Sequence, residues 1–178
     1  SVTDLLTGAR PEVQTLCWDP GTNLHILPAN ATLTDLEPEL WRRGDGRLQL
    51  KHALHPLLDA FDVMVIDTPP TLGLWTQAPL IASTELLIPV DMGSFAVAGM
   101  RQLLDAIARL RQEVPLTLAP PHILLTKVDA RTTLSAHVRA MLRESGGAEV
   151  LHTVIRVNVD LVRAQMARQS IFAYDRTS

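Results

Sequence analysis

The chain has 178 residues, of which 47% are hydrophobic, so it is long enough to bury the core of one domain. Its net charge of -3 excludes a generally basic protein, and any basic surface must be a local patch. A lone cysteine, Cys17, excludes an internal disulfide, and no long apolar run or cleavable signal is present, which predicts a cytoplasmic protein without a membrane segment.

The first 60 residues are expected to hold two short strands among helices. A helix over residues 3–6 is closed by Gly8, and strands over 13–18 and 24–27 are separated by an Asp-Pro-Gly turn. Thr34 and Glu37 have the spacing of a helix-capping box, and leucines recur at helical intervals beyond them. Glycines 44 and 46 are expected to split this stretch into two helices.

The pattern changes after Phe61. Residues 63–66 form a continuous apolar run, which is typical of a parallel strand covered on both faces, and the run ends at Asp67. The rest of the chain alternates between apolar runs and helical patterns. We expect helices over 72–82, 96–113, 132–143 and 159–168, and strands over 85–90, 122–126 and 149–155.

This alternation predicts an α/β fold. Repeated βαβ units give a doubly wound, mostly parallel sheet with helices on both faces. No linker or repeat divides the chain, so residues 1–178 are expected to form a single domain.

Asp67 is the first candidate for chemistry. In a doubly wound sheet the ligand crevice lies beyond the carboxyl ends of the strands, where a carboxylate can hold Mg²⁺ directly or through water. The alternative is that Asp67 caps the next turn or helix.

The decapeptide from Phe61 to Pro70 resembles the Walker B strand and the Asp-x-Pro-Pro loop of the ParA/MinD/Soj ATPases. Other blocks agree in order and favour ParA/Soj over MinD. They are residues 1–6, 24–30, 85–90, 124–132, 153–159 and 170–175. The resemblance covers nearly the whole chain and implies a P-loop type of fold that binds ATP and Mg²⁺.

The resemblance also implies roles for single residues. Asp67 would act on magnesium, through water, with Thr68 and Pro69 in the same nucleotide loop. Thr126 and Asp129 follow a strand end and would touch the base, although Asp129 before a helix is also ordinary turn chemistry.

The loop after the last strand is a further candidate. Arg156 and Asn158 would pack beside adenine. Arg156 stands where the family has proline, so a stacked guanidinium and a simple surface arginine both remain open.

The chain departs from the family at its amino-terminal side. A P-loop ends in Gly-Lys-Ser/Thr, yet no lysine in this sequence follows a glycine. Either the chain is a piece of a longer ATPase, which we favour because the lost part includes a central strand, or the protein has shed its catalytic start. In both cases we expect an incomplete domain that is inactive in ATP hydrolysis by itself, with no catalytic residue in this chain.

Charge is distributed unevenly along the chain. Residues 131–178 carry a net charge of +3, whereas the first 130 carry -6. Arg156, Arg163 and Arg168 are therefore candidates for nonspecific DNA contact, and a solvated helix face is the alternative.

The implied function is that of a ParA-like partition ATPase in chromosome or plasmid segregation. Such a protein would dimerise with ATP, bind DNA nonspecifically at the nucleoid and respond to a ParB-like activator, without a membrane partner. The alternatives are a non-enzymatic DNA- or partner-binding module with a degenerate fold, and a MinD-like positioning ATPase, which a basic amphipathic membrane helix would favour.

Overall fold

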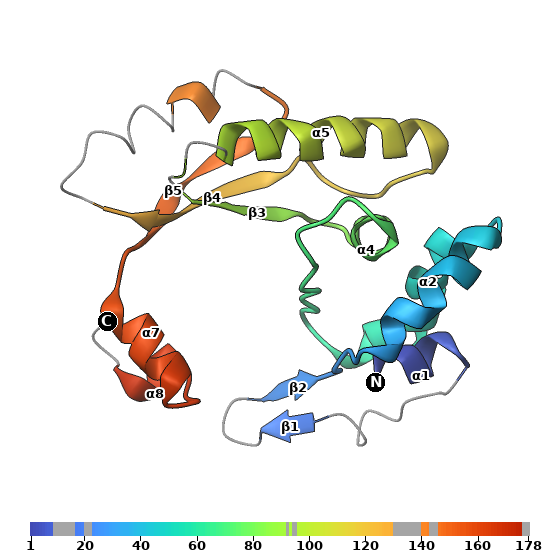
Figure 1. The fold of residues 1–178 in the computed structure, drawn as a ribbon, viewed down its shortest axis with the longest axis horizontal. Helices are drawn as coiled ribbons and strands as arrows, with labels where there is room; N and C mark the ends of the chain where they lie inside the picture. Colours follow the sequence, from blue (N-terminus) through green and yellow to red (C-terminus); the bar gives the residue numbers. More distant parts are fainter. Residues whose placement is uncertain are drawn as a thin grey trace. The chain divides into compact units, whose positions relative to one another are not determined.

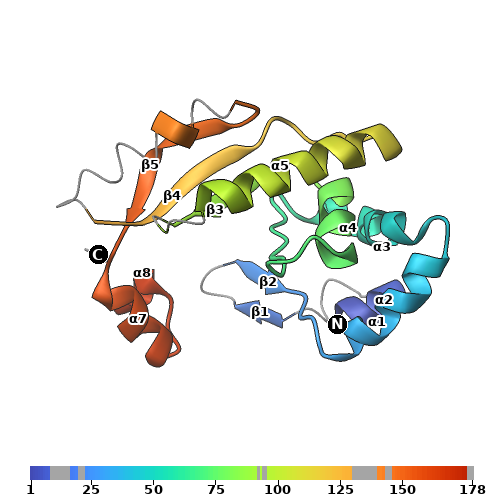
Figure 2. The same ribbon diagram turned by 45° about the horizontal axis from the view of Figure 1, so that its top comes forward.

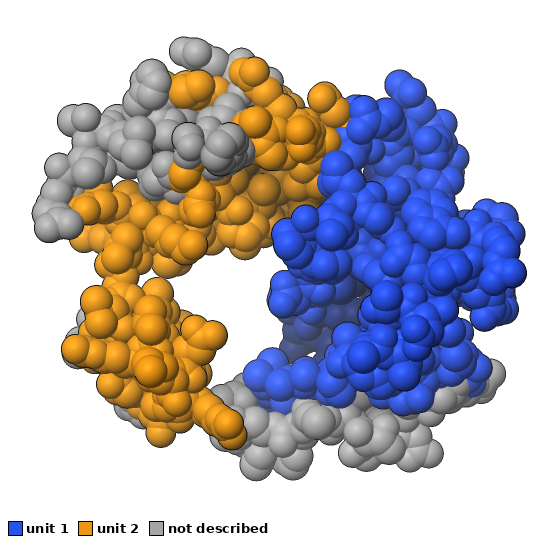
Figure 3. All heavy atoms as spheres, in the orientation of Figure 1, with its two compact units in different colours: residues 1–84, 106–118 blue, residues 85–105, 119–178 orange. Residues whose placement is uncertain are grey.

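The computed structural model describes residues 1–8, 17–19, 23–91, 93, 96–129, 140–142 and 146–175. These residues form two compact units, which Figure 3 shows in separate colours. Unit 1 comprises residues 1–84 and 106–118, and unit 2 comprises residues 85–105 and 119–178. Each unit is described by itself.

Unit 1 is mainly helical (Figure 1). Its helix α1 (Val2–Leu6) ends before Gly8, whose φ of +100° favours glycine, as the sequence predicts. The strands β1 (Cys17–Asp19) and β2 (Leu24–Ile26) pair as an antiparallel hairpin. The remaining elements are α2 (Thr32–Arg42), the 3₁₀ helices η2 (Gly46–Leu48) and η3 (His55–Ala60), α3 (Gln49–Leu54) and α4 (Leu74–Ala82).

The predicted capping box at Thr34 is wrong. Helix α2 begins two residues earlier, and its N-cap residue Ala31 makes no side-chain capping bond. Glu37 instead lies within the helix, where its Oε1 accepts hydrogen bonds from Trp41 Nε1 (3.2 Å) and Leu74 N (3.4 Å). The spacing in the sequence could not show that this carboxylate accepts a hydrogen bond from the first residue of α4.

The break between α2 and α3 depends on Gly46, as predicted. A Cβ at this position would lie 1.8 Å from the carbonyl oxygen of Leu40, which is backbone and therefore cannot rotate away. A Cβ at Gly44 would meet nothing within 4 Å. Gly46 is required by a close backbone approach, and Gly44 is not.

The core of unit 1 forms where α1, α3, η3 and α4 meet. Its buried members are Leu5, Leu50, Leu54, Leu57 and Ala78. Met64 and Ile66 pack against this cluster from the chain segment that precedes Asp67.

That segment was predicted to be a strand covered on both faces, and the prediction is wrong for the described residues. Residues 63–66 lie outside any helix or strand and pair with no described strand. Met64 and Ile66 face the core, whereas Val63 and Val65 are 78% and 87% exposed. A parallel strand needs a neighbouring strand for its hydrogen bonds, and no described residue supplies one here.

Unit 2 is built on the parallel sheet that the sequence predicts. The strands β3 (Leu87–Val90), β4 (His122–Val128) and β5 (Glu149–Arg156) lie in the order β3-β4-β5. Helix α5 (Ala96–Glu113), whose bounds match the prediction, lies along one face of the sheet in Figures 1 and 2. Its first ten residues belong to unit 2 and the rest to unit 1.

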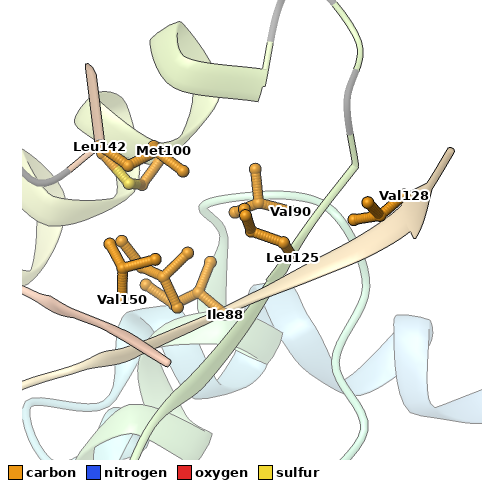
Figure 4. Packing of buried hydrophobic residues seen from close by; sticks show 8 residues of the cluster. Ile88, Val90, Met100, Leu125, Val128, Leu142 and Val150 are labelled. Atoms are coloured by element: carbon orange, nitrogen blue, oxygen red, sulfur yellow. The ribbon is translucent and has the colours of Figure 1, made fainter. Parts of the chain in front are cut away.

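The core of unit 2 lies between this sheet and its helices. Met100 of α5 packs with strand residues and with Leu142, as Figure 4 shows. The buried members are Ile88, Val90, Met100, Ile123, Leu125, Val128, Leu142 and Val150. Most of the predicted helix over 132–143 lies outside the described residues.

The chain closes with helices α7 (Val159–Met166) and α8 (Ile171–Tyr174). Asn158 Oδ1 accepts the Asp160 amide proton (2.7 Å) and so caps α7. Of the α7 residues, Ala164 is buried, whereas Met166 is 82% exposed.

Candidate functional site

A hollow of about 420 Å³ lies in unit 2 at the carboxyl ends of β3 and β4. Its lining comes from β3, from the first half of α5 and from the end of β4. The lining residues are Ile88, Pro89, Val90, Asp91, Gly99, Met100, Leu103, Thr126 and Lys127. Small-molecule sites typically have volumes of about 300–1,000 Å³, so the hollow can accept a group of nucleoside size.

The floor of the hollow is apolar. Val90 and Met100 are buried at 5% and 3% exposure, and both belong to the core of unit 2. A Cβ at Gly99 would meet nothing within 4 Å, so the α5 wall is open at that point.

The rim carries two opposite charges. Lys127 Nζ lies 3.7 Å from Asp91 Oδ2, and Asp91 Oδ1 accepts the Gly93 amide proton (3.0 Å). The two side chains are 75% and 51% exposed, so water screens the pair and its net stabilisation is small. The lysine has a φ of +52°, which is uncommon for a residue with a side chain. Breaking this exposed ion pair to bind a polar ligand would therefore cost little free energy.

The residues predicted to contact the base gather at this edge of the sheet. Thr126 lines the hollow, and Asp129 directly follows β4. Arg156 ends β5, where its Cα pairs with Val128, and Val157 N donates to Val128 O (3.1 Å). The side-chain oxygen of Asn158 already caps α7, which limits its use for a ligand.

Asp67 lies in unit 1 and is exposed, together with Thr68 and Pro69. Its carboxylate forms no hydrogen bond or ion pair within the described part of the chain. Helix α4 starts at Gly73 without a side-chain cap, and Glu37 accepts its Leu74 amide proton. The alternative that Asp67 caps this helix is therefore not supported, and the carboxylate can take a hydrated Mg²⁺.

The three arginines predicted to contact DNA are all exposed in unit 2. Arg163 forms an ion pair with Asp160 (3.0 Å), whereas no ion pair of Arg156 or Arg168 is found among the described residues. Arg168 has a φ of +55° just after α7. The positive charge of Arg163 is thus partly neutralised by a carboxylate of its own helix.

Sequence reasoning missed two kinds of residue. Asp91 follows β3 and Lys127 is the last residue but one of β4, so both lie near strand ends, the signal that singled out Thr126, but the lysine was considered only as a P-loop residue. Thr76 carried no sequence signal, because only the structure shows that it is buried. Within the described residues, no group of three His, Cys, Asp or Glu side chains could hold a metal ion, and no helix is long and apolar enough to cross a membrane.

Known proteins similar to this chain support the predicted family. The AAA domain family model matches residues 1–120. The chromosome-partitioning ATPase Soj of Treponema pallidum is 33% identical over 175 residues, which are 98% of this chain and 69% of that protein. The sporulation initiation inhibitor protein Soj of Bacillus subtilis is 35% identical over 156 residues, which are 88% of this chain and 62% of that protein.

The same family likeness holds in three dimensions. A cobyrinic acid a,c-diamide synthase of Mycobacterium smegmatis, solved with a bound ATP analog and magnesium, superposes with a TM-score of 0.76 at 28% identity. The superposition covers 95% of this chain and 74% of that protein, so this chain spans about two thirds to three quarters of the length of the proteins it matches here. The chain belongs to the ParA/Soj family of ATPases and has the α/β fold of that family.

Proposed function

We propose that the protein is a ParA-like partition ATPase of the bacterial cytoplasm, acting in the segregation of a chromosome or plasmid. The observation that carries the proposal is that Thr126, Asp129 and Arg156 lie at the carboxyl ends of β4 and β5, where Thr126 also lines a hollow of about 420 Å³. In a parallel sheet this edge is where ligands bind.

The chain's own residues suit the nucleotide and its metal. The apolar floor at Val90 and Met100 suits a base ring, and Lys127 at the rim suits an anionic or carbonyl group. The exposed carboxylate of Asp67 would hold a water of a hydrated Mg²⁺. When bound, Mg²⁺ neutralises charge that develops on the phosphates.

The proposal includes three partners. Two copies would dimerise around ATP, the arginines near α7 would contact DNA without reading its sequence, and a ParB-like protein would stimulate hydrolysis. The support is family membership and, for DNA, the exposure of Arg156 and Arg168.

The test is binding of a fluorescent ATP analogue to the full-length protein with and without Mg²⁺. We expect Asp67→Asn to abolish the gain in affinity that Mg²⁺ provides. Asp62→Asn is the matched control, because Asp62 is also exposed and lies five residues before Asp67 in the sequence. Absence of binding, or equal behaviour of the two variants, would contradict the proposal.

A second measurement separates an ATPase from a non-enzymatic module. The 178-residue chain by itself is expected to hydrolyse ATP at the background rate, because its sequence has no Gly-Lys-Ser/Thr loop to stabilise charge on the transferred phosphoryl group. Turnover by this chain that Asp67→Asn abolishes would show that the expectation is wrong. Absence of turnover in the full-length protein would favour the non-enzymatic module.

A further inference from the structure

The loop that follows Asp67 is tied to the first turn of α4 by one buried hydroxyl. Thr76 is 7% exposed and is the buried polar residue of the described chain. Its Oγ1 donates to Thr71 O and lies 3.4 Å from Pro69 O. A hydroxyl has a single proton, so the two carbonyls share one donor.

Other contacts restrain the same loop. Pro69 and Pro70 lack an N–H and have a fixed φ, so this part of the loop has few conformations. Thr71 N donates to Pro69 O (2.8 Å), and the Gln77 amide Nε2 donates to Leu72 O (3.2 Å). Three carbonyls of the loop are thus bonded either within it or to α4.

The first turn of α4 is itself held from outside. Glu37 of α2 accepts the Leu74 amide proton, and Arg47 Nη1 lies 3.4 Å from Gln77 Oε1 and 2.6 Å from Glu113 Oε2. All these residues belong to unit 1. The loop therefore rests on a turn that α2, η2 and the end of α5 keep in place.

We propose that Thr76 is a positioning residue for Asp67, and this inference rests on the function proposed above. Only Thr68 separates Asp67 from Pro69, and consecutive Cα atoms are about 3.8 Å apart, so a movement of the Pro69 carbonyl is passed to the Asp67 carboxylate. Thr76 does not touch the nucleotide or metal. It sets where the magnesium-binding carboxylate stands by holding the loop that carries it.

Hydrogen exchange on this chain tests the hold on the loop. Thr76→Val keeps the shape of the side chain but removes the donor, and a buried hydrogen bond contributes about 0.5–1.5 kcal/mol. We expect exchange of the Thr71 and Leu74 amides to become roughly 2- to 12-fold faster, with no change at Leu54 in α3. Thr76→Ser, which keeps the hydroxyl, should restore most of the protection.

Thr34→Val is the matched control, since Thr34 is exposed on α2 and no hydrogen bond of its hydroxyl is found among the described residues. Unchanged exchange in the loop of Thr76→Val would overturn the inference. Equal acceleration in the loop and in α3 would overturn it as well, because the hydroxyl would then support unit 1 as a whole.

The magnesium requirement of the full-length protein tests the link to Asp67. We expect Thr76→Val to raise the Mg²⁺ concentration for half-maximal ATP hydrolysis about 2- to 12-fold, by the same bond energy, with little change in kcat at saturating Mg²⁺ and with rescue by serine. A faster-exchanging loop with an unchanged magnesium requirement would overturn the positioning role. Failure of the unsubstituted protein to bind ATP would sink the proposed function instead, while the exchange result would still report on the loop.

Discussion

Two apolar runs of this chain, residues 63–66 and strand β4, look alike in the sequence and differ in the structure. Strand β4 lies between β3 and β5, and its Ile123 and Leu125 are fully buried. Residues 63–66 form no strand, and Val63 and Val65 are 78% and 87% exposed. An apolar run therefore indicates that a segment is suited to a buried position. Whether its side chains are buried depends on the strands and helices that lie beside it.

The difference bears on function because each run ends at a candidate site residue. Thr126 follows Leu125, which pairs with Val90 of β3 and with Val154 of β5, so the sheet holds the chain just before the hollow. Asp67 ends its run without such pairing among the described residues, and the loop contacts of Thr76 hold the chain just beyond it. The two candidate residues, one in each unit, are thus held by different means.

The largest expected effect tests this contrast directly. Leu125→Ala should lower the free energy of unfolding by about 3 kcal/mol, because it removes a buried side chain and leaves a cavity. Val65→Ala should change it by less than about 0.5 kcal/mol, since its side chain already faces solvent. Urea denaturation of both variants is the measurement. A loss at Val65 as large as that at Leu125 would show that residues 63–66 are covered in solution.

A second prediction concerns the backbone of unit 1. Gly46→Ala should cost about 2 kcal/mol of unfolding free energy, because a Cβ would meet the Leu40 carbonyl oxygen at 1.8 Å. Gly44→Ala is the control, since nothing lies within 4 Å of its added carbon. Thermal unfolding followed by circular dichroism compares them. Equal melting temperatures would mean that the approach of these two backbone segments is looser than described.

A third prediction follows from the exposed face at residues 63–66. Exposed apolar side chains on a segment without strand partners among the described residues favour association with other chains. We therefore expect the 178-residue chain to self-associate at micromolar concentration, and Val63→Glu with Val65→Lys to reduce this association. The pair of changes adds no net charge, so a loss of association reports on apolar contact. Light scattering is the measurement, and a monodisperse parent would contradict the prediction.

The sequence predicted most elements of the fold, because strands β3, β4 and β5 and helix α5 carry strong periodic patterns. It failed at residues 63–66, where the burial of a strand depends on a neighbour that the pattern does not contain. It also misread Glu37, because a carboxylate three residues after a threonine can cap its own helix or bond another one.

For the candidate site, strand ends were the useful signal. They pointed to Thr126, Asp129 and Arg156, which lie at or next to the carboxyl ends of β4 and β5, and the contact of these residues with a base stays a prediction. The position after a strand could not show whether the side chain of Asn158 faces a ligand or caps α7, because an asparagine in either role can follow a strand. Lys127 was considered only as a possible P-loop lysine and was set aside because no glycine precedes it. Its position near the end of β4 was not used.

The smallest expected effect concerns DNA. If the arginines near α7 bind phosphate, log K should fall with log salt with a slope of about 3, since each of three contacts contributes about 0.9. The affinity should be weak, with a Kd of roughly 10⁻⁴ to 10⁻⁶ M at physiological salt, and two unrelated duplexes should bind equally. Fluorescence anisotropy across a salt series measures both quantities.

The three arginines should not contribute equally. Arg163 already forms an ion pair with Asp160 at 3.0 Å, so its replacement should lower the slope less than that of Arg156 or Arg168, for which the described residues offer no ion pair. Arg156→Ala and Arg168→Ala should each lower the slope by about 0.9. Arg43→Ala is the control, because Arg43 is exposed on unit 1 and paired with Glu39. A slope that none of the three changes alters would assign these arginines to a solvated surface, and the contact with DNA would then have to come from another part of the protein.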